Sequence, residues 1–152
     1  MAEIAQLNCG DVYIDEKSGS LIVQKGKGGK KRIVQFNSRF RHHYQQYINW
    51  KQTNAESVKP NEPLLRSSHT GGHMTVRALE KAFKRTAARA GLPEHYSIHC
   101  CRHTFACHLY KASGYNLRLV QKQLGHSRSR TTEVYADVMD PDITKSLEKL
   151  YV

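Results

Sequence analysis

The sequence predicts an α+β fold, namely a mostly helical domain with a small three-stranded antiparallel sheet at its N-terminal side. Two patterns support this class. Short β-branched runs alternate with turn residues over the first 36 residues, and apolar residues recur at helical spacing after them. A chain of 152 residues can bury roughly 70% of the surface that its unfolded form exposes, which suffices for a core without disulfides. We therefore expect one domain over residues 1–152.

The three strands are expected at 12–14, 21–23 and 32–36, after the tail of a helix at 1–7. The first two are separated by the turn residues Lys17-Ser18-Gly19-Ser20, and the last two by the glycine-rich segment Gly26-Lys27-Gly28-Gly29. Glycine permits tight chain reversals, so each separation is typical of a hairpin.

Two amphipathic helices are expected to follow the sheet. Asn37 or Ser38 can cap the first, which runs to about Thr53, and the second begins at Thr75 and ends at Gly91. Apolar side chains recur on one face of each helix. They are Phe40, Tyr44, Tyr47 and Ile48 in the first helix, and Val76, Leu79, Phe83 and Ala87 in the second.

The last third of the chain is expected to be helical as well. One helix has a core face at i, i+3, i+7 and i+11, and the next is stopped by Gly125. Short helices over 131–138 and 142–150 complete the chain. The core residues expected here are Ile98, Cys101, Phe105 and Leu109, followed by Leu117, Val120 and Leu124.

The charge of the chain is strongly basic and unevenly distributed. The formal net charge is +11, and nine Lys or Arg residues but no acid lie between Lys17 and Ala55. A one-sided basic field favours a polyanionic partner, because neutralising phosphates releases condensed counterions. The alternative is a merely soluble basic surface.

Neither a membrane span nor a signal peptide is indicated, so we expect a cytoplasmic protein. The four cysteines, Cys9, Cys100, Cys101 and Cys107, show no Cys-x-x-Cys spacing. We expect all four to be reduced thiols.

Three short motifs lie between His99 and Tyr135. They are His99-Cys100-Cys101-Arg102-His103, then Leu124-Gly125-His126-Ser127, and then Tyr135, nine residues after His126. A guanidinium matches phosphate oxygens bidentately, a histidine moves protons near neutral pH, and a tyrosine hydroxyl can be a covalent nucleophile. The combination indicates phosphodiester chemistry without a metal.

In this order and spacing, the motifs resemble the catalytic domain of the tyrosine recombinase (phage integrase) family. The resemblance covers nearly the whole chain and implies site-specific DNA recombination or integration. By this resemblance, Tyr135 attacks a DNA phosphate, forms a 3′-phosphotyrosyl bond and releases a 5′-hydroxyl. The covalent link conserves the bond energy, so no cofactor is implied.

The resemblance also implies roles for the neighbouring residues. Arg102 and His126 would hold the non-bridging phosphate oxygens, His99 would accept the tyrosine proton, and His103 would orient its neighbours. Lys27, in the Gly-Lys-Gly turn, would protonate the departing 5′-oxygen; the alternative is a solvated basic turn. Taken singly, Arg102 could form a surface ion pair and His126 could cap a helix.

Double-stranded DNA is the expected partner, and four protomers would assemble on two DNA sites if the family behaviour holds. No membrane partner is expected. Seven more basic residues are expected to contact DNA: Lys25, Lys30, Lys31, Arg32, Arg77, Lys81 and Lys84.

Three other interpretations stay open. His99 and His103 have the i, i+4 spacing of a helical zinc pair, but Cys100 stands where a zinc protease needs its Glu. A catalytically inert DNA-binding remnant would have the same fold and charge. A type IB topoisomerase would use similar chemistry, although the Leu-Gly-His-Ser phrase is more similar to integrases.

The family has another phosphate-binding arginine in a Gly-Leu-Arg-x-x-Glu phrase. The segment from Glu3 to Asn8, with Asp11, resembles the sequence after that arginine, which would then stand immediately before Met1. We therefore expect a fragment that lacks this arginine and the preceding DNA-binding domain. Such a fragment would be weakly active or inactive alone.

Overall fold

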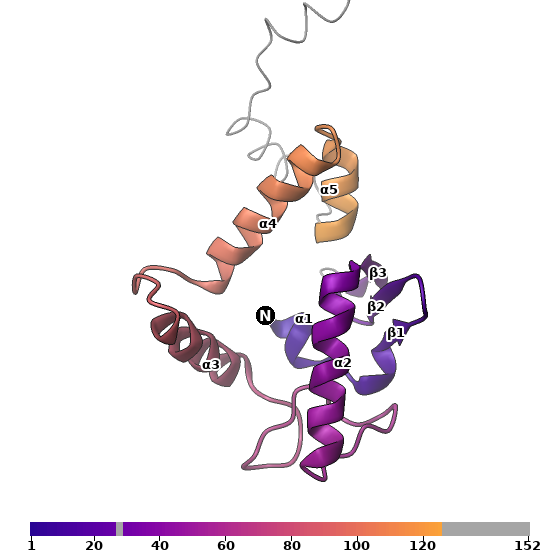
Figure 1. The fold of residues 1–152 in the computed structure, drawn as a ribbon, viewed down its shortest axis with the longest axis vertical. Coiled ribbons are helices and arrows are strands. Elements are labelled where there is room, and N and C mark those ends of the chain that lie inside the picture. Colours follow the sequence, from indigo (N-terminus) through magenta and orange to yellow (C-terminus); the bar gives the residue numbers. More distant parts are fainter. Residues whose placement is uncertain (27–28, 126–152) are drawn as a thin grey trace, which may run out of the picture. The chain divides into compact units, whose positions relative to one another are not determined.

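The computed structural model describes residues 1–26 and 29–125 (Figure 1). The chain divides into two compact units, Met1–Ser97 and Ile98–Val152. The expectation of one domain over residues 1–152 stays a prediction. Within the described ranges, no helix is long and apolar enough to cross a membrane.

The first unit begins with helix α1 (Ala2–Ala5) and the short 3-10 helix η1 (Cys9–Asp11). Strands β1 (Val12–Ile14), β2 (Gly19–Val23) and β3 (Arg32–Gln35) follow. They pair antiparallel in the order β1-β2-β3. The predicted fold class and both hairpins are therefore confirmed. However, β2 begins two residues earlier than expected, because Gly19 and Ser20 pair with β1, and β3 ends one residue earlier.

Helix α2 (Ser38–Thr53) packs against this sheet. Its start is set by Asn37, whose Oδ1 accepts the backbone N–H of Phe40 at 3.0 Å, as the capping pattern predicts. The apolar face of α2 and the sheet share one core cluster. The cluster consists of buried Leu7, Cys9 and Leu64 with partly buried Val12, Leu21, Tyr44, Tyr47, Ile48 and Val58.

The expected inward residue Phe40 is 47% exposed, so it contributes less to this core than predicted. It packs on Phe36 instead, with the ring centroids 4.6 Å apart. Phe36 lies directly over Gly19, where an added Cβ atom would be 2.1 Å from the ring carbon Cε2. Glycine is required at the start of β2 because a larger residue would displace this aromatic pair.

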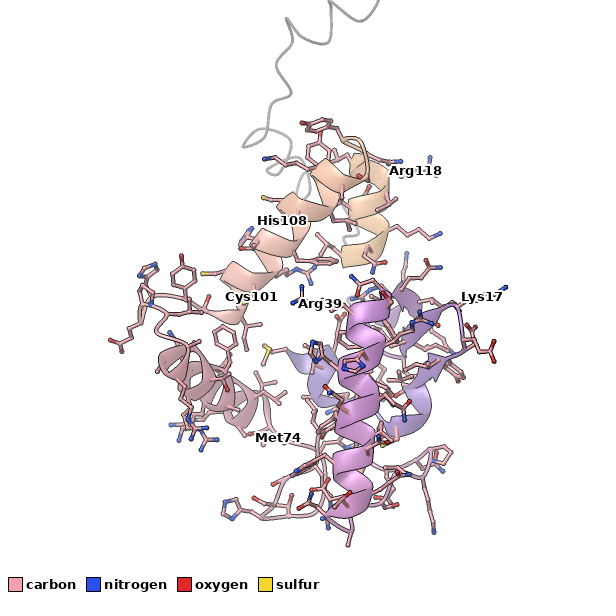
Figure 2. All side chains as sticks on the ribbon, viewed as in Figure 1. Lys17, Arg39, Met74, Cys101, His108 and Arg118 are labelled. Carbon is pink, nitrogen blue, oxygen red and sulfur yellow. The ribbon has the colours of Figure 1, made fainter. Side chains whose placement is uncertain are left out.

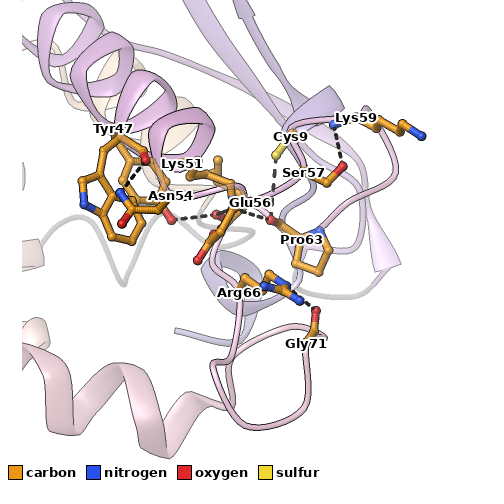
Figure 3. A network of polar contacts seen from close by, with 12 residues as sticks. Cys9, Tyr47, Lys51, Asn54, Glu56, Ser57, Lys59, Pro63, Arg66 and Gly71 are labelled. Atoms are coloured by element: carbon orange, nitrogen blue, oxygen red, sulfur yellow. Dashed lines mark hydrogen bonds and ion pairs between the residues drawn. The ribbon is translucent and has the colours of Figure 1, made fainter.

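The loop after α2 is held by Lys51, which is fully buried (Figure 3). Its Nζ lies 2.8 Å from the Glu56 carboxylate and donates to the carbonyls of Pro63 and Leu64 at 3.3 and 3.2 Å. The Tyr47 hydroxyl donates to the same Leu64 carbonyl at 2.9 Å. This network fixes residues 56–64 against the end of α2.

Helix α3 (Val76–Arg89) ends the first unit's regular structure. The Thr75 hydroxyl caps it by accepting the backbone N–H of Ala78 at 3.1 Å. Leu79 and Ala87 are buried as predicted, whereas Val76 at the first position is 36% exposed. The helix ends close to the predicted boundary, two residues before Gly91.

The second unit contains α4 (Ile98–Ala112) and α5 (Leu117–Leu124). Gly125 terminates α5 in the left-handed conformation, with φ of 70°, as predicted. The core of this unit is formed by Ala106, Tyr110, Val120 and Leu124, with Cys107, Leu109 and Leu117 packed around it. The short helices expected at 131–138 and 142–150 lie outside the described residues.

The predicted core face of α4 is wrong by about one residue position. Cys101 is exposed and Phe105 is 47% exposed, while Ala106 is 0% exposed. One position corresponds to about 100° around a helix. The buried face includes Ala106 because a small side chain lets α5 approach closely, and a pattern of large apolar residues does not report this. Figure 2 shows Cys101 and His108 on the side of α4 that points away from α5.

Candidate active site

Two of the five expected catalytic residues, His99 and Arg102, lie one turn apart at the beginning of α4. His99 is exposed and Arg102 is half-buried. Arg102 Nη2 donates to the backbone carbonyl of Leu124 at 2.8 Å, across 22 residues of sequence. The structure thus connects the His-x-x-Arg motif to the beginning of the Leu-Gly-His-Ser motif.

The acceptor of this bond is the last residue of α5. The final carbonyls of a helix have no partner within the helix and carry partial negative charge, so a guanidinium is stabilised there. The neighbouring Gly125 already turns the chain out of the helix. The bond therefore fixes the Arg102 guanidinium beside the residue pair that immediately precedes His126.

The other three expected catalytic residues, Lys27, His126 and Tyr135, lie outside the described residues. Their roles stay predictions. The described ends of the Lys27 turn do form a hairpin: the Gly26 amide donates to the Lys30 carbonyl at 3.0 Å, and the Gly29 amide donates to the Gly26 carbonyl at 2.9 Å. His103, the expected orienting residue, is exposed on α4.

Most of the expected DNA-contacting residues are exposed. Lys84 is among them, but its Nζ donates to the carbonyls of Glu94 and Tyr96, the latter at 2.8 Å. It therefore holds the loop after α3. The other exposed members of the expected set are Lys25, Lys30, Lys31, Arg77 and Lys81.

Arg32 has a different environment from the other six. Its Nη1 and Nη2 donate to the two carboxylate oxygens of Glu3 at 2.7 and 2.8 Å. The hydrogen bond to Glu3 raises the pKa of the Arg32 guanidinium. In the structure this guanidinium thus binds a protein carboxylate, whereas the sequence predicts that it contacts a DNA phosphate.

Sequence reasoning missed two ion pairs between described residues of the first unit, Glu3 with Arg32 and Lys51 with Glu56. A sequence signal existed only for Lys51 and Glu56, which are close in the chain. Cys9, Cys100, Cys101 and Cys107 form no disulfide within the described part of the chain. Over residues 1–26 and 29–125, no group of three His, Cys, Asp or Glu side chains is arranged to hold a metal ion.

Comparison with known proteins identifies the family of this chain. The model of the phage integrase family matches residues 1–141. Tyrosine recombinase XerC of Haemophilus ducreyi is 35% identical over 135 residues, which cover 89% of this chain and 42% of that protein. Tyrosine recombinase XerD of Rickettsia bellii is 31% identical, covering 97% of this chain and 50% of that protein.

Solved structures agree with these sequence matches. The site-specific recombinase XerH, in its post-cleavage complex with a palindromic difH substrate, matches with a TM-score of 0.75 and 26% identity. That match covers 96% of this chain and 40% of XerH. The XerA recombinase shares the fold, with a TM-score of 0.74 at 23% identity.

The chain belongs to the phage integrase family. The two relatives named above are tyrosine recombinases. It spans between two-fifths and half the length of the two relatives named.

Proposed function

We propose that this chain acts in site-specific DNA recombination or integration, by cleaving and rejoining DNA strands through a 3′-phosphotyrosyl intermediate on Tyr135. Family membership supports the reaction class. The observation that carries the proposal is the hydrogen bond from Arg102 to the Leu124 carbonyl, since it brings two separate motifs of the expected site together.

In the proposed reaction, Arg102 and His126 hold the non-bridging oxygens of the scissile phosphate. Negative charge grows on these oxygens as the Tyr135 oxygen approaches phosphorus. One preorganised donor of this kind is worth roughly 2.7–4 kcal/mol of barrier lowering. The bond to Leu124 supports this role because it restricts the Arg102 guanidinium before DNA binds.

Two proton transfers complete the cleavage step. The Tyr135 hydroxyl proton passes to His99 as the new bond between oxygen and phosphorus forms. The bond from phosphorus to the 5′-oxygen breaks, and Lys27 gives that oxygen a proton. The reverse sequence, with a 5′-hydroxyl from another strand, rejoins the DNA. The exposure of His99 supports its access to a bound substrate.

Double-stranded DNA is the proposed substrate and partner. XerH is bound to difH substrate in a pre-cleavage and in a post-cleavage structure that match this chain. In this chain, exposed Lys25, Lys30 and Lys31 surround the Lys27 turn, and Arg77 and Lys81 are exposed on α3. We further propose that four protomers assemble on two DNA sites.

We also propose that strand cleavage needs an arginine immediately before Met1. The similarity of the Glu3 to Asn8 segment to the family phrase supports this position. Such an arginine would add a second guanidinium to the phosphate site. Without it, we expect weak or no strand transfer.

A covalent-adduct assay tests the proposed function. A duplex selected by this chain from a randomised pool is nicked near its centre, so that the cleaved end diffuses away and the adduct accumulates. The chain with Gly-Leu-Arg placed before Met1 should form a denaturant-resistant adduct. Tyr135→Phe should abolish the adduct and retain binding, whereas the matched control Tyr13→Phe, a 54% exposed tyrosine on β1, should change neither.

The same assay separates the alternatives. DNA binding without any adduct from the arginine-extended chain would contradict the proposal and favour an inert DNA-binding module. Relaxation of supercoiled plasmid without a preferred site would favour a topoisomerase.

A further inference from the structure

The Glu3–Arg32 ion pair joins two segments that are 29 residues apart in sequence. Glu3 lies in α1, and Arg32 is the first residue of β3, where it pairs with Val23 at the end of β2. Both guanidinium nitrogens meet both carboxylate oxygens, which fixes the relative direction of the two side chains. The pair therefore ties α1 to the turn end of the β2–β3 hairpin.

The pair is also partly shielded from solvent. The exposed fractions of the Arg32 and Glu3 side chains are 19% and 31%. Arg32 Nε is buried and has no hydrogen-bond partner among the described residues. A cation in this position depends on its carboxylate partner, because removing one member of a partly buried pair leaves the other charge uncompensated.

The hairpin packs directly on the pair. A Cβ atom added to Gly26 would lie 2.8 Å from Arg32 Nη1 and 3.4 Å from a carboxylate oxygen of Glu3. It would also lie 2.7 Å from the Lys30 carbonyl, which accepts the Gly26 amide. Gly26 thus fits between the ion pair and the opposite side of its own turn.

We propose that the Glu3–Arg32 ion pair is a positioning device for the described segments 24–26 and 29–32, which flank the Lys27 turn. In the proposed reaction, which this inference presupposes, the pair acts by holding the turn from which Lys27 protonates the departing 5′-oxygen. Glu3 and Arg32 are positioning residues here and do not contact the DNA. Arg32 therefore has a different role from Lys30 and Lys31, which are proposed to contact DNA.

Hydrogen–deuterium exchange tests the positioning without any catalysis. In Glu3→Gln, which keeps the side-chain shape, the amides of Gly26 and Gly29 should exchange about 10-fold faster. The matched control Glu16→Gln changes an exposed glutamate at the β1–β2 turn and should leave both amides unchanged. Unchanged exchange in Glu3→Gln would overturn the proposal. So would an equal acceleration throughout α2, because the pair would then be a general stabilising contact.

A substrate with sulfur in place of the bridging 5′-oxygen tests the link to Lys27. A thiol has a pKa of about 8.5, so the sulfur leaves as a thiolate and its departure does not depend on an acid. With the arginine-extended chain, Glu3→Gln should slow cleavage of the oxygen substrate about 10-fold, a part of what a general acid contributes. Cleavage of the sulfur substrate should slow less than about 3-fold on the same reasoning.

Equal slowing on both substrates would overturn the link to the acid, even though the arginine-extended chain with Glu3 intact cleaves DNA. If the arginine-extended chain with Glu3 intact forms no adduct with either substrate, the proposed function fails, and with it the role of the ion pair in the reaction. The exchange measurement then decides the positioning of the hairpin by itself.

Discussion

Replacing Lys51 by methionine should strongly destabilise the first unit, because the lysine is fully buried and its ammonium group has three acceptors. The Glu56 carboxylate lies 2.8 Å away, and the carbonyls of Pro63 and Leu64 lie 3.3 and 3.2 Å away. Methionine has a similar length, so it fills the volume but leaves these acceptors without the donor.

The magnitude follows from the interactions that the substitution removes. Breaking a buried ion pair by removing one partner costs about 3–5 kcal/mol. Glu56 is 20% exposed and can regain some hydration, which favours the lower part of this range. The Leu64 carbonyl also keeps its bond from the Tyr47 hydroxyl. We therefore expect a decrease of about 3 kcal/mol in the free energy of unfolding.

Urea denaturation measures this decrease. With a slope of about 2 kcal/mol per molar urea, a decrease of about 3 kcal/mol shifts the midpoint by about 1.5 M. The double variant Lys51→Met with Glu56→Leu should recover part of the stability, because no carboxylate is then left near the apolar site. The control Lys59→Met alters an exposed lysine of the same loop. A decrease below about 1 kcal/mol for Lys51→Met, or no recovery in the double variant, would refute the reasoning.

Two further predictions concern salt and pH. Lys31→Gln should reduce the slope of log affinity for DNA against log salt by about 0.9. Arg32→Gln should leave this slope unchanged, because Glu3 binds the Arg32 guanidinium. Equal changes of the slope in the two variants would contradict the different environments of the two residues. Burial raises the pKa of Tyr44 and of Tyr47 to about 12 from an ordinary value of 10. The folded state therefore retains protons on these two hydroxyls that the unfolded state loses above pH 10. Their contribution to stability should be constant below about pH 9 and fall between pH 10 and 12. Tyr44→Phe should make this fall shallower in denaturation at pH 9 and pH 11, and an unchanged dependence would contradict the assignment.

Local sequence signals determined the parts of the fold that could be predicted. Asn37 and Thr75 start helices by accepting backbone N–H groups three residues later, and Gly125 ends one with a positive φ. The two hairpins follow from turn residues between β-branched runs. These features depend on neighbours in the chain, so a single sequence contains the information needed to place them.

Features that depend on contacts between distant segments could not be predicted in this way. The sequence shows that Arg32 is a cation beside a basic turn, but not that Glu3 of another element approaches it. It likewise shows an apolar stripe on α4 that includes Phe105. The choice of Ala106 as the buried residue depends on where α5 packs, which is a tertiary property.

The candidate site shows the same division. The order of the motifs identified His99 and Arg102 as a pair on one helix turn, and both residues lie in α4. The bond that links Arg102 to Leu124 depends on the packing of α4 with α5, and spacing alone did not reveal it.

Mass-spectrometric mapping of the DNA attachment point tests the central claim most directly. The arginine-extended chain is trapped on a nicked duplex, digested with protease and nuclease, and the peptide that carries a nucleotide is sequenced. The proposed reaction predicts a 3′-phosphate ester on Tyr135. Attachment at another residue, or through a 5′-phosphate, would contradict it.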